Sequence, residues 1–508
     1  MQDQIVYAIV LVVYLAAMIG IGFIFFKRNE TQSDYLLGGR TLNPFVSAMS
    51  AQASDMSGWL MMGLPGAAFA LSGSLSDAFW TAVGLGVGTY INWLILAKRL
   101  RKFTEVYDNS ITVPSYLQNR FHDQSRVLRT VAALVIIVFF LIYTAAQFAA
   151  GAKLFNAMFG LDYSVALLLG TFIIVSYTFL GGYKAVCWTD LVQGLLMFAA
   201  LVAVVIAAVT SIGGPAAVNQ TLVTQNLSDH LLTEKDWIGL NTIGGLGILS
   251  ALAWGFGYFG QPHIVVRFMG IRHSRDIKPA RRIAMVWVII SLTCAVLIGI
   301  VGKAYLSLKM DATAFAAMDG EKVFIELVKM IFAGPGLSII AGVLLAAILA
   351  AIMSTADSQL LVTSSAVSED IFRAFVKKDV SDKTLMWISR GAVIVITIIA
   401  ALLAIDPDSS VFGLVAYAWA GFGAAFGPVI LISLYWKRMN LAGAVAGVLS
   451  GGITVIVWRN FIKPFFGVYE LLPAFIIAVI CIVVVSLVTK PPKPEIEEEF
   501  DRALNADV

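Results

Sequence analysis

The chain has 508 residues, of which 59% are hydrophobic and only 13% charged, about half the charged share of an ordinary soluble domain. This composition excludes a soluble globular protein, a disordered chain, a collagen-like fibre and a small disulfide-stapled domain. Because 35 basic residues nearly balance 32 acidic ones, the net charge of +3 gives no reason to expect a nucleic-acid partner. The apolar residues form blocks long enough to cross a bilayer, which predicts an all-α polytopic membrane protein.

Thirteen segments of roughly 20 residues each are predicted to span the bilayer as helices. In chain order they are 5–26, 43–70, 76–97, 127–152, 163–180, 190–211, 240–262, 283–303, 333–362, 385–405, 410–435, 440–458 and 469–489. We expect one membrane transport domain over residues 1–490. A short tail, 491–508, is rich in proline and acidic residues and is predicted to be solvated.

The segments between the predicted spans differ sharply in Lys and Arg content. One side holds 27 of the 35 basic residues, including those of segments 98–129 and 267–282, and the other side holds 8. Basic residues concentrate in cytoplasmic loops. The asymmetry therefore predicts an N-terminus outside and a C-terminus in the cytoplasm, which an odd number of spans also requires.

The second predicted span, Pro44–Pro65, is apolar yet carries a stripe of hydroxyl groups. Its serines recur at three- and four-residue spacing along one helix face: Ser47, Ser50, Ser54 and Ser57. Asp55 stands mid-span, where an ionisable side chain costs at least ~2.5–3.5 kcal/mol unless it faces protein or water. Gly58 predicts an interruption, which lipid tolerates only where the backbone lines a cavity. We favour a transport pathway over a structural polar network.

A second glycine-rich interruption is predicted over Gly244–Pro262. Its G-x-G-x-x-G string lacks the preceding strand of a dinucleotide-binding unit, so a broken membrane helix explains it better. Trp254 and Tyr258 flank this break four residues apart, and we favour cavity lining over an interfacial aromatic belt. Two interrupted helices in separate halves predict an inverted-repeat secondary transporter. The repeats would cover about 43–211 and 240–435, with extra helices at 5–26, 440–458 and 469–489.

A third polar stretch lies in the apolar segment Ala346–Val362. Ala351, Ser354 and Thr355 follow i, i+3, i+4 spacing, so a carbonyl and two hydroxyls can face one point. Hard cations take such oxygen ligands, but serine and threonine hydroxyls also bond to their own helix carbonyls. Spacing alone leaves both readings open. Paired catalytic carboxylates, a phosphate-binding loop and a metal cluster are lacking, so neither an enzyme nor an ATP-driven pump is expected.

At these residues the chain resembles the sodium/solute symporter family, most closely its proline-transporting branch. The resemblance extends over about residues 5–490 and rests on the strings SDYLLGGR, SAQASDMSGWLMMGLPG, WTDLVQG, GYFGQPHIVVRFM and ILAAIMSTADSQLLV. It implies an inverted five-helix-repeat core of the neurotransmitter-type sodium symporter fold, with one helix before the core and two after it.

The resemblance also implies roles for individual residues. The sodium ligands would be the main-chain oxygens or hydroxyls of Ala53, Met56, Ala351, Ser354 and Thr355. Sodium coupling or the ion's path would involve Asp55 and Asp190, and transport would depend on Arg40. The substrate-binding positions would be Ser57, Gly58, Trp59, Tyr143, Trp254, Tyr258 and Pro262.

The implied function is import of L-proline coupled to Na+ by alternating access, across the bilayer of a bacterial plasma membrane. We expect no cofactor, no nucleic acid and no obligatory protein partner. A symporter for another small solute, such as another amino acid, betaine or a carboxylate, remains open. A transporter-like sensor or a channel is a rival from a different class. The short tail argues against a sensor, and two broken helices argue against a simple pore.

Overall fold

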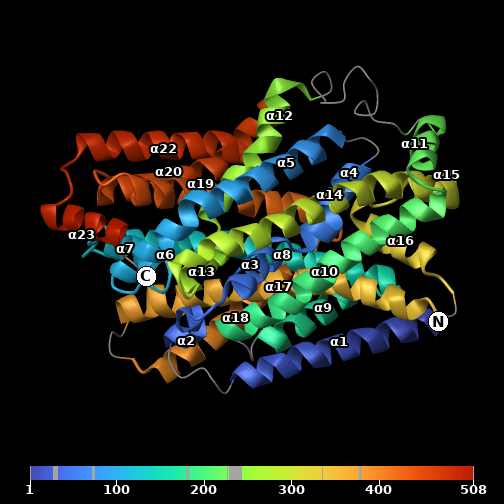
Figure 1. Cartoon of the computed structure of the whole chain (residues 1–508), viewed down its shortest axis with the longest axis horizontal. Helices are drawn as coiled ribbons and strands as arrows, with labels where there is room; N and C mark the ends of the chain where they lie inside the picture. The colour runs from blue at the N-terminus through green and yellow to red at the C-terminus, as the bar shows by residue number, and fades with distance from the viewer. Residues whose placement is uncertain are drawn as a thin grey trace.

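The computed structural model describes residues 2–26, 32–70, 75–178, 182–225, 227, 243–334, 336–376, 380–506 and 508. Across these ranges the secondary structure is helical, without a β-strand, and most long helices run roughly along the longest axis of the molecule (Figure 1). The two termini lie toward opposite ends of this axis. We call these ends the N-terminal end and the C-terminal end of the bundle.

Ten helical segments in the described part of the chain are long and apolar enough to cross a membrane. They are built on α1 (Gln2–Phe26), α5 (Leu75–Ile91) with η3 (Asn92–Leu96) and α6 (Ala97–Val106), α8 (Val127–Phe159), α10 (Tyr183–Ile212), α14 (Ile277–Lys309), α17 (Ser338–Ser365), α18 (Asp382–Leu403), α19 (Val411–Tyr435), α20 (Leu441–Val457) and α22 (Leu471–Val488). Each coincides with a predicted span.

The other three predicted spans coincide with shorter helices. Span 163–180 is α9 (Tyr163–Thr178). Span 43–70 is divided into α3 (Pro44–Asp55), η2 (Trp59–Gly63) and α4 (Leu64–Phe69). Span 240–262 corresponds to α12 (Gly244–Leu252) and the 3₁₀ segment η5 (Ala253–Gly260), and its predicted start lies outside the described residues; the predicted end was too early, because the broken helix continues as α13 (Pro262–Gly270). Both predicted interruptions are thus confirmed.

The remaining elements connect these helices at the two ends of the bundle. They are α2 (Gln32–Leu37), η1 (Gly38–Arg40), α7 (Val113–Arg120), α11 (Pro215–Thr224), η6 (Ser274–Asp276), α15 (Ala312–Ala316), η7 (Gly320–Lys322), α16 (Val323–Ile331), η8 (Ala366–Val376), η9 (Trp458–Ile462), α21 (Lys463–Phe466) and α23 (Pro494–Asn505). Helices α11, α15 and α16 lie at the N-terminal end, whereas α7 and α23 lie at the C-terminal end (Figure 1).

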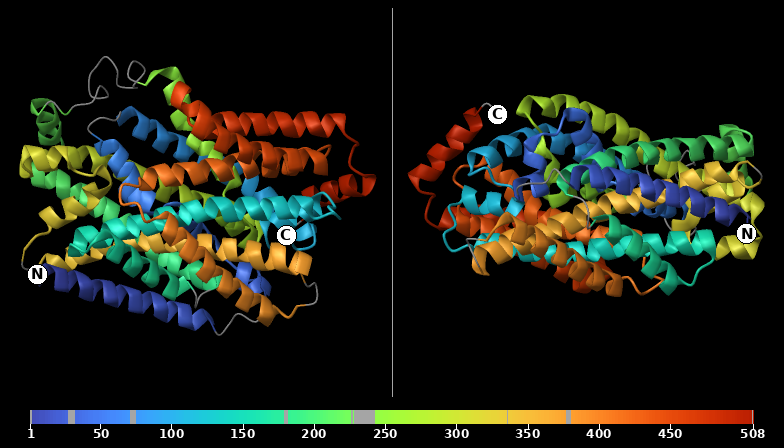
Figure 2. Two further views of the ribbon diagram at one scale, coloured as in Figure 1. Left: turned by 180° about the vertical axis from the view of Figure 1, so that it is seen from behind. Right: turned by 90° about the horizontal axis from the view of Figure 1, so that it is seen from below.

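The interior of the bundle is formed around α17 and α19. In each of them, 83% of the residues in the most apolar window are buried, compared with 28% in α1. Figure 2 shows α1 along the outside of the bundle. Outer helices expose large apolar side chains, such as Phe172 on α9, as expected for surfaces that face lipid. Helices α3 and α13 are almost wholly buried, whereas α12 exposes Leu246 and Leu249.

The C-terminal tail differs from the prediction of a solvated end. Residues 494–505 form α23, and its apolar residues Ile496, Phe500 and Ala503 are buried. Phe500 packs edge-to-face on Phe103 of α6, with 5.2 Å between ring centroids, and the Arg120 guanidinium lies 4.9 Å from the Phe500 ring centroid. The prediction was wrong because prolines and acidic residues obscured an i, i+4, i+7 apolar face.

We expect Phe500→Ala to detach α23 from the C-terminal end of the bundle. Removing a buried phenylalanine side chain costs about 3–5 kcal/mol in a packed core, whereas exposed ion pairs, such as Lys437 with Asp501, contribute only about 0–1 kcal/mol. Tryptic cleavage after Arg502 should then accelerate at least about tenfold in the purified protein. The matched variant Phe466→Ala removes an exposed ring and should cleave at the wild-type rate. Equal rates for both variants would contradict this role of Phe500.

Candidate functional site

The first interruption leaves backbone groups that side chains must satisfy. Helix α3 begins with the Asn43 side chain accepting from the Val46 N–H (2.9 Å) and ends at Asp55. After the break, the Gly58 N–H donates to the Gln147 Oε1 of α8 (3.3 Å), while the Gln147 Nε2 donates to the Ser57 hydroxyl (3.2 Å). The Gln147 side chain of α8 therefore binds two adjacent residues of the break.

Asp55 connects the first interruption to the second. It is completely buried, and its Oδ2 accepts a hydrogen bond from the Tyr258 hydroxyl of η5 (2.7 Å). Its backbone carbonyl accepts from the Trp59 indole Nε1 (2.9 Å). The Asp55 Oδ1 has no hydrogen-bond partner within the described ranges. One buried carboxylate oxygen thus remains available for a further ligand.

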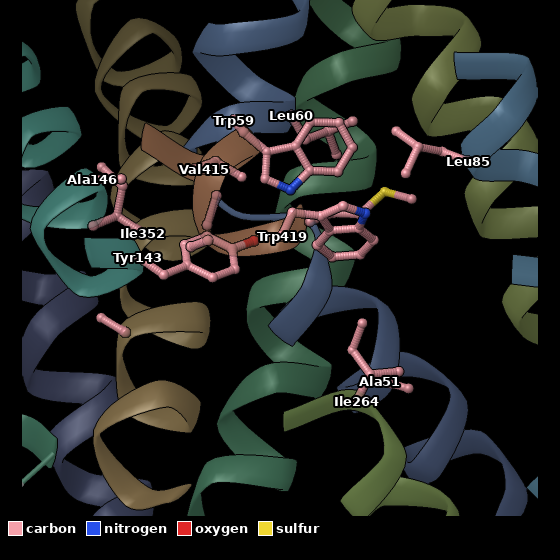
Figure 3. Close-up of a cluster of buried hydrophobic side chains, with 14 of the residues drawn as sticks. Ala51, Trp59, Leu60, Leu85, Tyr143, Ala146, Ile264, Ile352, Val415 and Trp419 are labelled. Atoms are coloured by element: carbon pink, nitrogen blue, oxygen red, sulfur yellow. The ribbon is translucent and has the colours of Figure 1, made fainter. Parts of the chain in front are cut away.

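The aromatic rings near this carboxylate come from several helices. Trp59, Tyr143 and Trp419 lie around the same region in Figure 3, which also draws the aliphatic residues behind them. The Trp419 ring packs edge-on against Tyr258, with 5.0 Å between centroids. All four side chains are buried, and the Tyr143 hydroxyl has no partner in the described part of the chain. The arrangement combines apolar ring faces with a few polar atoms, a combination that is typical of small-molecule sites.

Glycines determine how closely η5 approaches its neighbours. A Cβ on Gly255 would lie 2.3 Å from the Gly84 carbonyl oxygen of α5, and one on Gly88 would lie 2.4 Å from the Gly255 Cα. A Cβ on Gly257 would lie 1.9 Å from the Trp419 Nε1. Since no side chain fits at these positions, the glycines of η5 permit direct backbone packing on α5 and α19.

The hydroxyls of α17 reach across to the first broken helix. The Ser354 hydroxyl donates to the Ala53 carbonyl (2.7 Å) and also to the Ala351 carbonyl of its own helix (3.1 Å). The Thr355 hydroxyl donates to the same Ala53 carbonyl at 3.4 Å. The Ser354 bond to Ala351 is the expected bond of a hydroxyl to its own helix, whereas sodium ligation by these residues stays a prediction. Four of the five predicted sodium ligands meet here, and Met56 is the residue at which α3 breaks.

A second buried polar cluster lies beside this contact. The Asp190 Oδ2 of α10 accepts from the hydroxyls of Ser50 (2.6 Å) and Ser54 (3.1 Å). The Arg267 guanidinium of α13 lies 3.2 Å from the same oxygen and donates to the Ser358 hydroxyl of α17 (2.6 Å). All five side chains are completely buried. The predicted serine stripe is thus a real polar face, and it points toward α10, α13 and α17.

Arg267 was missed by the sequence analysis, which counted it among the basic residues of a connecting segment. It is the sixth residue of α13 and pairs with Asp190. Its place in the apolar stretch that follows Pro262 could have indicated that Arg267 is buried in the broken helix. Gln147 and Trp419 were also missed, although each is a polar or amphipathic residue in the middle of an apolar span.

Other predicted site residues lie apart from Asp55. The Arg40 guanidinium donates to the Met269 carbonyl (2.6 Å) and to the Ser110 carbonyl (3.0 Å), so it joins the chain before α3 to the end of α13 and the loop after α6. Pro262 begins α13 and lines a small cavity with Arg267. Their proposed roles in transport and substrate binding remain predictions.

Trp254 also occupies a different environment from Tyr258. Its ring stacks on Phe412 and on Tyr469, with 5.0 Å between centroids in both pairs. Its carbonyl accepts from the Trp419 Nε1 (2.8 Å). Trp254 therefore contacts Trp419 through its carbonyl and through its ring, with 6.5 Å between the two ring centroids.

Comparisons with known proteins extend over nearly the whole chain. It is 48% identical over 481 residues to the osmoregulated proline transporter OpuE of Bacillus subtilis (strain 168), covering 94% of each protein. It is 47% identical over 491 residues to the sodium/proline symporter of Escherichia coli (strain K12), covering 97% of this chain and 95% of that protein.

Solved structures are similar in fold. A sodium-coupled sialic acid symporter in a substrate-bound outward-open state gives a TM-score of 0.78 at 22% identity, covering 96% of this chain and 98% of that one. Mhp1, a nucleobase-cation-symport-1 family transporter, gives 0.53 at 14% identity over 92% and 98% of the two chains. The model of the sodium:solute symporter family matches residues 35–451. The chain therefore belongs to the sodium:solute symporter family.

Proposed function

We propose that this protein is a symporter that couples inward sodium flow to uptake of L-proline by alternating access. The observation that carries the proposal is the meeting of two interrupted helices with the hydroxyls of α17, where Ser354 and Thr355 share the Ala53 carbonyl and Asp55 bonds to Tyr258. Relatives named as proline transporters along nearly the full chain support the choice of substrate.

Sodium would bind between α3 and α17. Its proposed ligands are the carbonyls of Ala53, Met56 and Ala351 and the hydroxyls of Ser354 and Thr355, a set of neutral oxygens that suits a monovalent ion which must also leave. The two hydroxyls now donate to the Ala53 carbonyl. On binding, the hydroxyls would turn their lone pairs to the ion, which would replace these hydrogen bonds and join the two helices.

Proline would bind between the two interruptions. Its carboxylate would lie toward the amide of Gly58 and the hydroxyl of Ser57, where it would replace Gln147 as their partner, because amides at a helix break favour anionic groups. Its ring would pack against Trp59, Tyr143 and Tyr258. We propose Trp254 and Pro262 as contacts on the route to and from this position, since their side chains line other cavities.

The proposed topology has thirteen spans, with the N-terminus outside and the C-terminus in the cytoplasm of a bacterium. Two inverted repeats, about 43–211 and 240–435, would form the core of a single transport domain over 1–490. The distribution of basic residues supports this orientation. The backbone pairing of Leu42, before α3, with Ile271, after α13, supports opposite directions for the two broken helices, because one begins where the other ends.

The coupling is energetically sufficient. At an inside-negative potential of 100 mV, one inward positive charge contributes ~2.3 kcal/mol before any sodium gradient is counted. Since 1.4 kcal/mol corresponds to a tenfold concentration ratio, this term alone supports roughly fiftyfold accumulation.

The test is uptake of labelled L-proline by the purified protein in liposomes. An inward sodium gradient with an inside-negative potential should drive accumulation above the external concentration, and replacing sodium by choline should abolish it. Accumulation against a gradient excludes a channel. Stronger competition by another amino acid, betaine or a carboxylate than by unlabelled proline would favour the alternative substrate. Uptake that is independent of sodium would overturn the proposal.

We expect Ser354→Ala and Thr355→Ala to raise the sodium concentration for half-maximal uptake, by up to about tenfold each, since a lost neutral ligand costs about 0.5–1.5 kcal/mol. The KM for proline at saturating sodium should change much less. Ser364→Ala is the matched control, because within the described residues the Ser364 hydroxyl bonds to nothing but the Leu361 carbonyl of its own helix. If the three variants had the same sodium dependence, the two hydroxyls would not be sodium ligands.

A further inference from the structure

An apolar groove of about 630 Å³ lies between α5 and α14, which run side by side (Figure 1). We call it the α5–α14 groove. Almost all of its lining side chains are apolar, and those of Phe79, Val87 and Ile289 are exposed, so the groove opens on the outside of the bundle. Along α14 it extends from Met285 to Ile300, a rise of about 22 Å. Because both helices belong to candidate membrane spans, this outside surface faces lipid.

The groove passes Gly86, where α5 presents no side chain. A Cβ on Gly86 would lie 4.0 Å from the Leu292 Cδ1 of α14, which is an ordinary contact, so a larger residue would fit there. Gly84 and Gly88 of the same helix differ, because a Cβ on either would collide with the backbone of α12 or η5, at 2.5 Å and 2.4 Å. Packing within the protein therefore requires those two glycines but not Gly86.

Three cations continue the line of the groove along α14. Lys278, Arg281 and Arg282 precede Met285 by seven, four and three residues, so all four side chains lie on one face of the helix. The Arg281 guanidinium carbon lies 5.3 Å from the ring centroid of Tyr90, which lines the groove. This cation–π contact holds a positive charge at the mouth of the groove.

The charge of these cations is not balanced by the protein itself. Among the described residues, no carboxylate lies within ion-pair distance of Lys278, Arg281 or Arg282, whereas the preceding Arg272 pairs with Asp276 (2.6 Å). Lys278 and Arg282 are exposed, and Arg281 is half-buried. The preference of basic residues for cytoplasmic segments accounts for their presence but not for their alignment with an apolar groove.

The two helices that form the groove also support the two interruptions. Helix α5 contacts η5 where Gly88 meets Gly255, and α14 approaches α4 so closely that a Cβ on Gly299 would lie 2.5 Å from the Pro65 carbonyl oxygen. A molecule in the groove would therefore contact the supports of both broken helices.

We infer that the α5–α14 groove is a binding site for one anionic phospholipid, a site that does not depend on the proposed transport of proline. The phosphate would bind Arg281 and Arg282, since guanidinium groups bind phosphate oxygens in pairs. One acyl chain would lie along the groove past Gly86. A hydrocarbon leaflet is about 15 Å deep, so a chain anchored at the mouth fills much of a groove of this length. With the proposed topology, the lipid belongs to the cytoplasmic leaflet.

Charge favours an anionic lipid over the other molecules that could cover this face. In a twofold-symmetric dimer the same surface of both copies meets, so the three cations of one copy would face those of the other. A zwitterionic phospholipid carries a cationic group that would meet the same three cations. An anionic phospholipid combines a negative headgroup with an apolar chain.

Native mass spectrometry of the purified full-length chain, titrated in detergent with dioleoyl phosphatidylglycerol or dioleoyl phosphatidylcholine, tests the headgroup. The wild type should retain one phosphatidylglycerol at concentrations at which phosphatidylcholine is lost. Arg281→Gln combined with Arg282→Gln should weaken the binding of phosphatidylglycerol about twenty-five-fold, since each cation near an anionic lipid contributes about fivefold. Lys383→Gln, at an exposed position in the first turn of α18, is the matched control and should bind as the wild type does.

A second variant tests the position of the acyl chain. Gly86→Leu keeps all three cations but fills the groove, and it should weaken the binding of phosphatidylglycerol about tenfold, the effect of about two displaced methylene groups. Gly391→Leu is the matched control, because Gly391 of α18 is exposed and no atom lies within 4 Å of where its Cβ would stand. Phosphatidylglycerol should also raise the unfolding temperature of the wild type more than that of Gly86→Leu.

The results that overturn the inference are separate for its parts. Equal retention of both lipids by the wild type overturns a site for an anionic phospholipid, and this result needs no variant to fold. Unchanged binding in the double arginine variant overturns the headgroup assignment, and unchanged binding in Gly86→Leu overturns the groove as the place of the chain. The measurements use neither sodium nor proline, so their failure leaves the proposed function intact.

Discussion

Asp55→Asn is expected to lower sodium-driven proline uptake about a hundredfold. The substitution preserves size, and the amide oxygen can still accept from the Tyr258 hydroxyl, which lies 2.7 Å from the Asp55 Oδ2. The change therefore isolates the negative charge. An interaction with a charged group contributes about 1.5–3 kcal/mol when buried, and 1.4 kcal/mol is tenfold, so the upper part of this range gives the stated loss.

Initial rates in proteoliposomes across a range of sodium concentrations measure this effect. The half-saturating sodium concentration should rise together with the loss of rate, because the substitution removes the negative charge of a buried carboxylate whose Oδ1 is unpartnered within the described residues. Asp311→Asn, at the exposed start of α15, is the control and should transport normally, since asparagine also caps helices. An Asp55→Asn protein with the wild-type sodium dependence would show that the charge has no part in coupling.

Arg267→Met should destabilise the folded protein by about 3–5 kcal/mol, because it leaves the carboxylate of Asp190 buried without its cation. The guanidinium also donates to Ser50 (3.1 Å) and to the His263 carbonyl (2.7 Å), so several acceptors lose a partner together. The cluster joins α3, α10, α13 and α17, so its loss should weaken the packing of all four helices.

Thermal unfolding in detergent, with and without a second substitution, separates the charge effect from lost packing. Arg267→Met combined with Asp190→Asn should recover much of the lost stability, because the uncompensated charge is then removed. Arg275→Met, an exposed arginine of η6, serves as the control and should unfold at the wild-type temperature. If the double variant were as unstable as the sum of its single variants, the pair would not interact.

The helices and their interruptions could be predicted because they depend on local sequence. An apolar block identifies a span, and glycine or proline identifies a break, as in Pro44–Pro65. The serine stripe and the pair Ser354 and Thr355 follow from the 3.6-residue period alone. Their partners, Asp190 and Ala53, lie more than a hundred residues away, and no local pattern indicates them.

Trp254 and Tyr258 show where the helical period misleads. Their four-residue spacing would place both on one face of an α-helix, and the resemblance implies that both bind substrate, which stays a prediction. Segment η5 is instead a 3₁₀ helix, in which three residues complete a turn, so residues four apart point about 120° away from each other. Tyr258 donates to Asp55, while Trp254 lines a cavity together with Asp77 and Arg459. The three glycines that allow this winding are visible in the sequence, but the winding itself depends on packing against α5 and α19.

The backbone contact of η5 with α5 and α19 has a consequence for how access can alternate. Interfaces between glycines have no side chains that could rotate to absorb a displacement, so sliding along the Gly88–Gly255 contact would bring backbone atoms into collision. We therefore expect these three elements to move together. Movement would then occur between the polar face of α3 and α17. There the hydroxyls of Ser354 and Thr355 can give up their hydrogen bonds to the Ala53 carbonyl and bind an ion instead. Sodium would then bind at the surface along which the two parts of the molecule move.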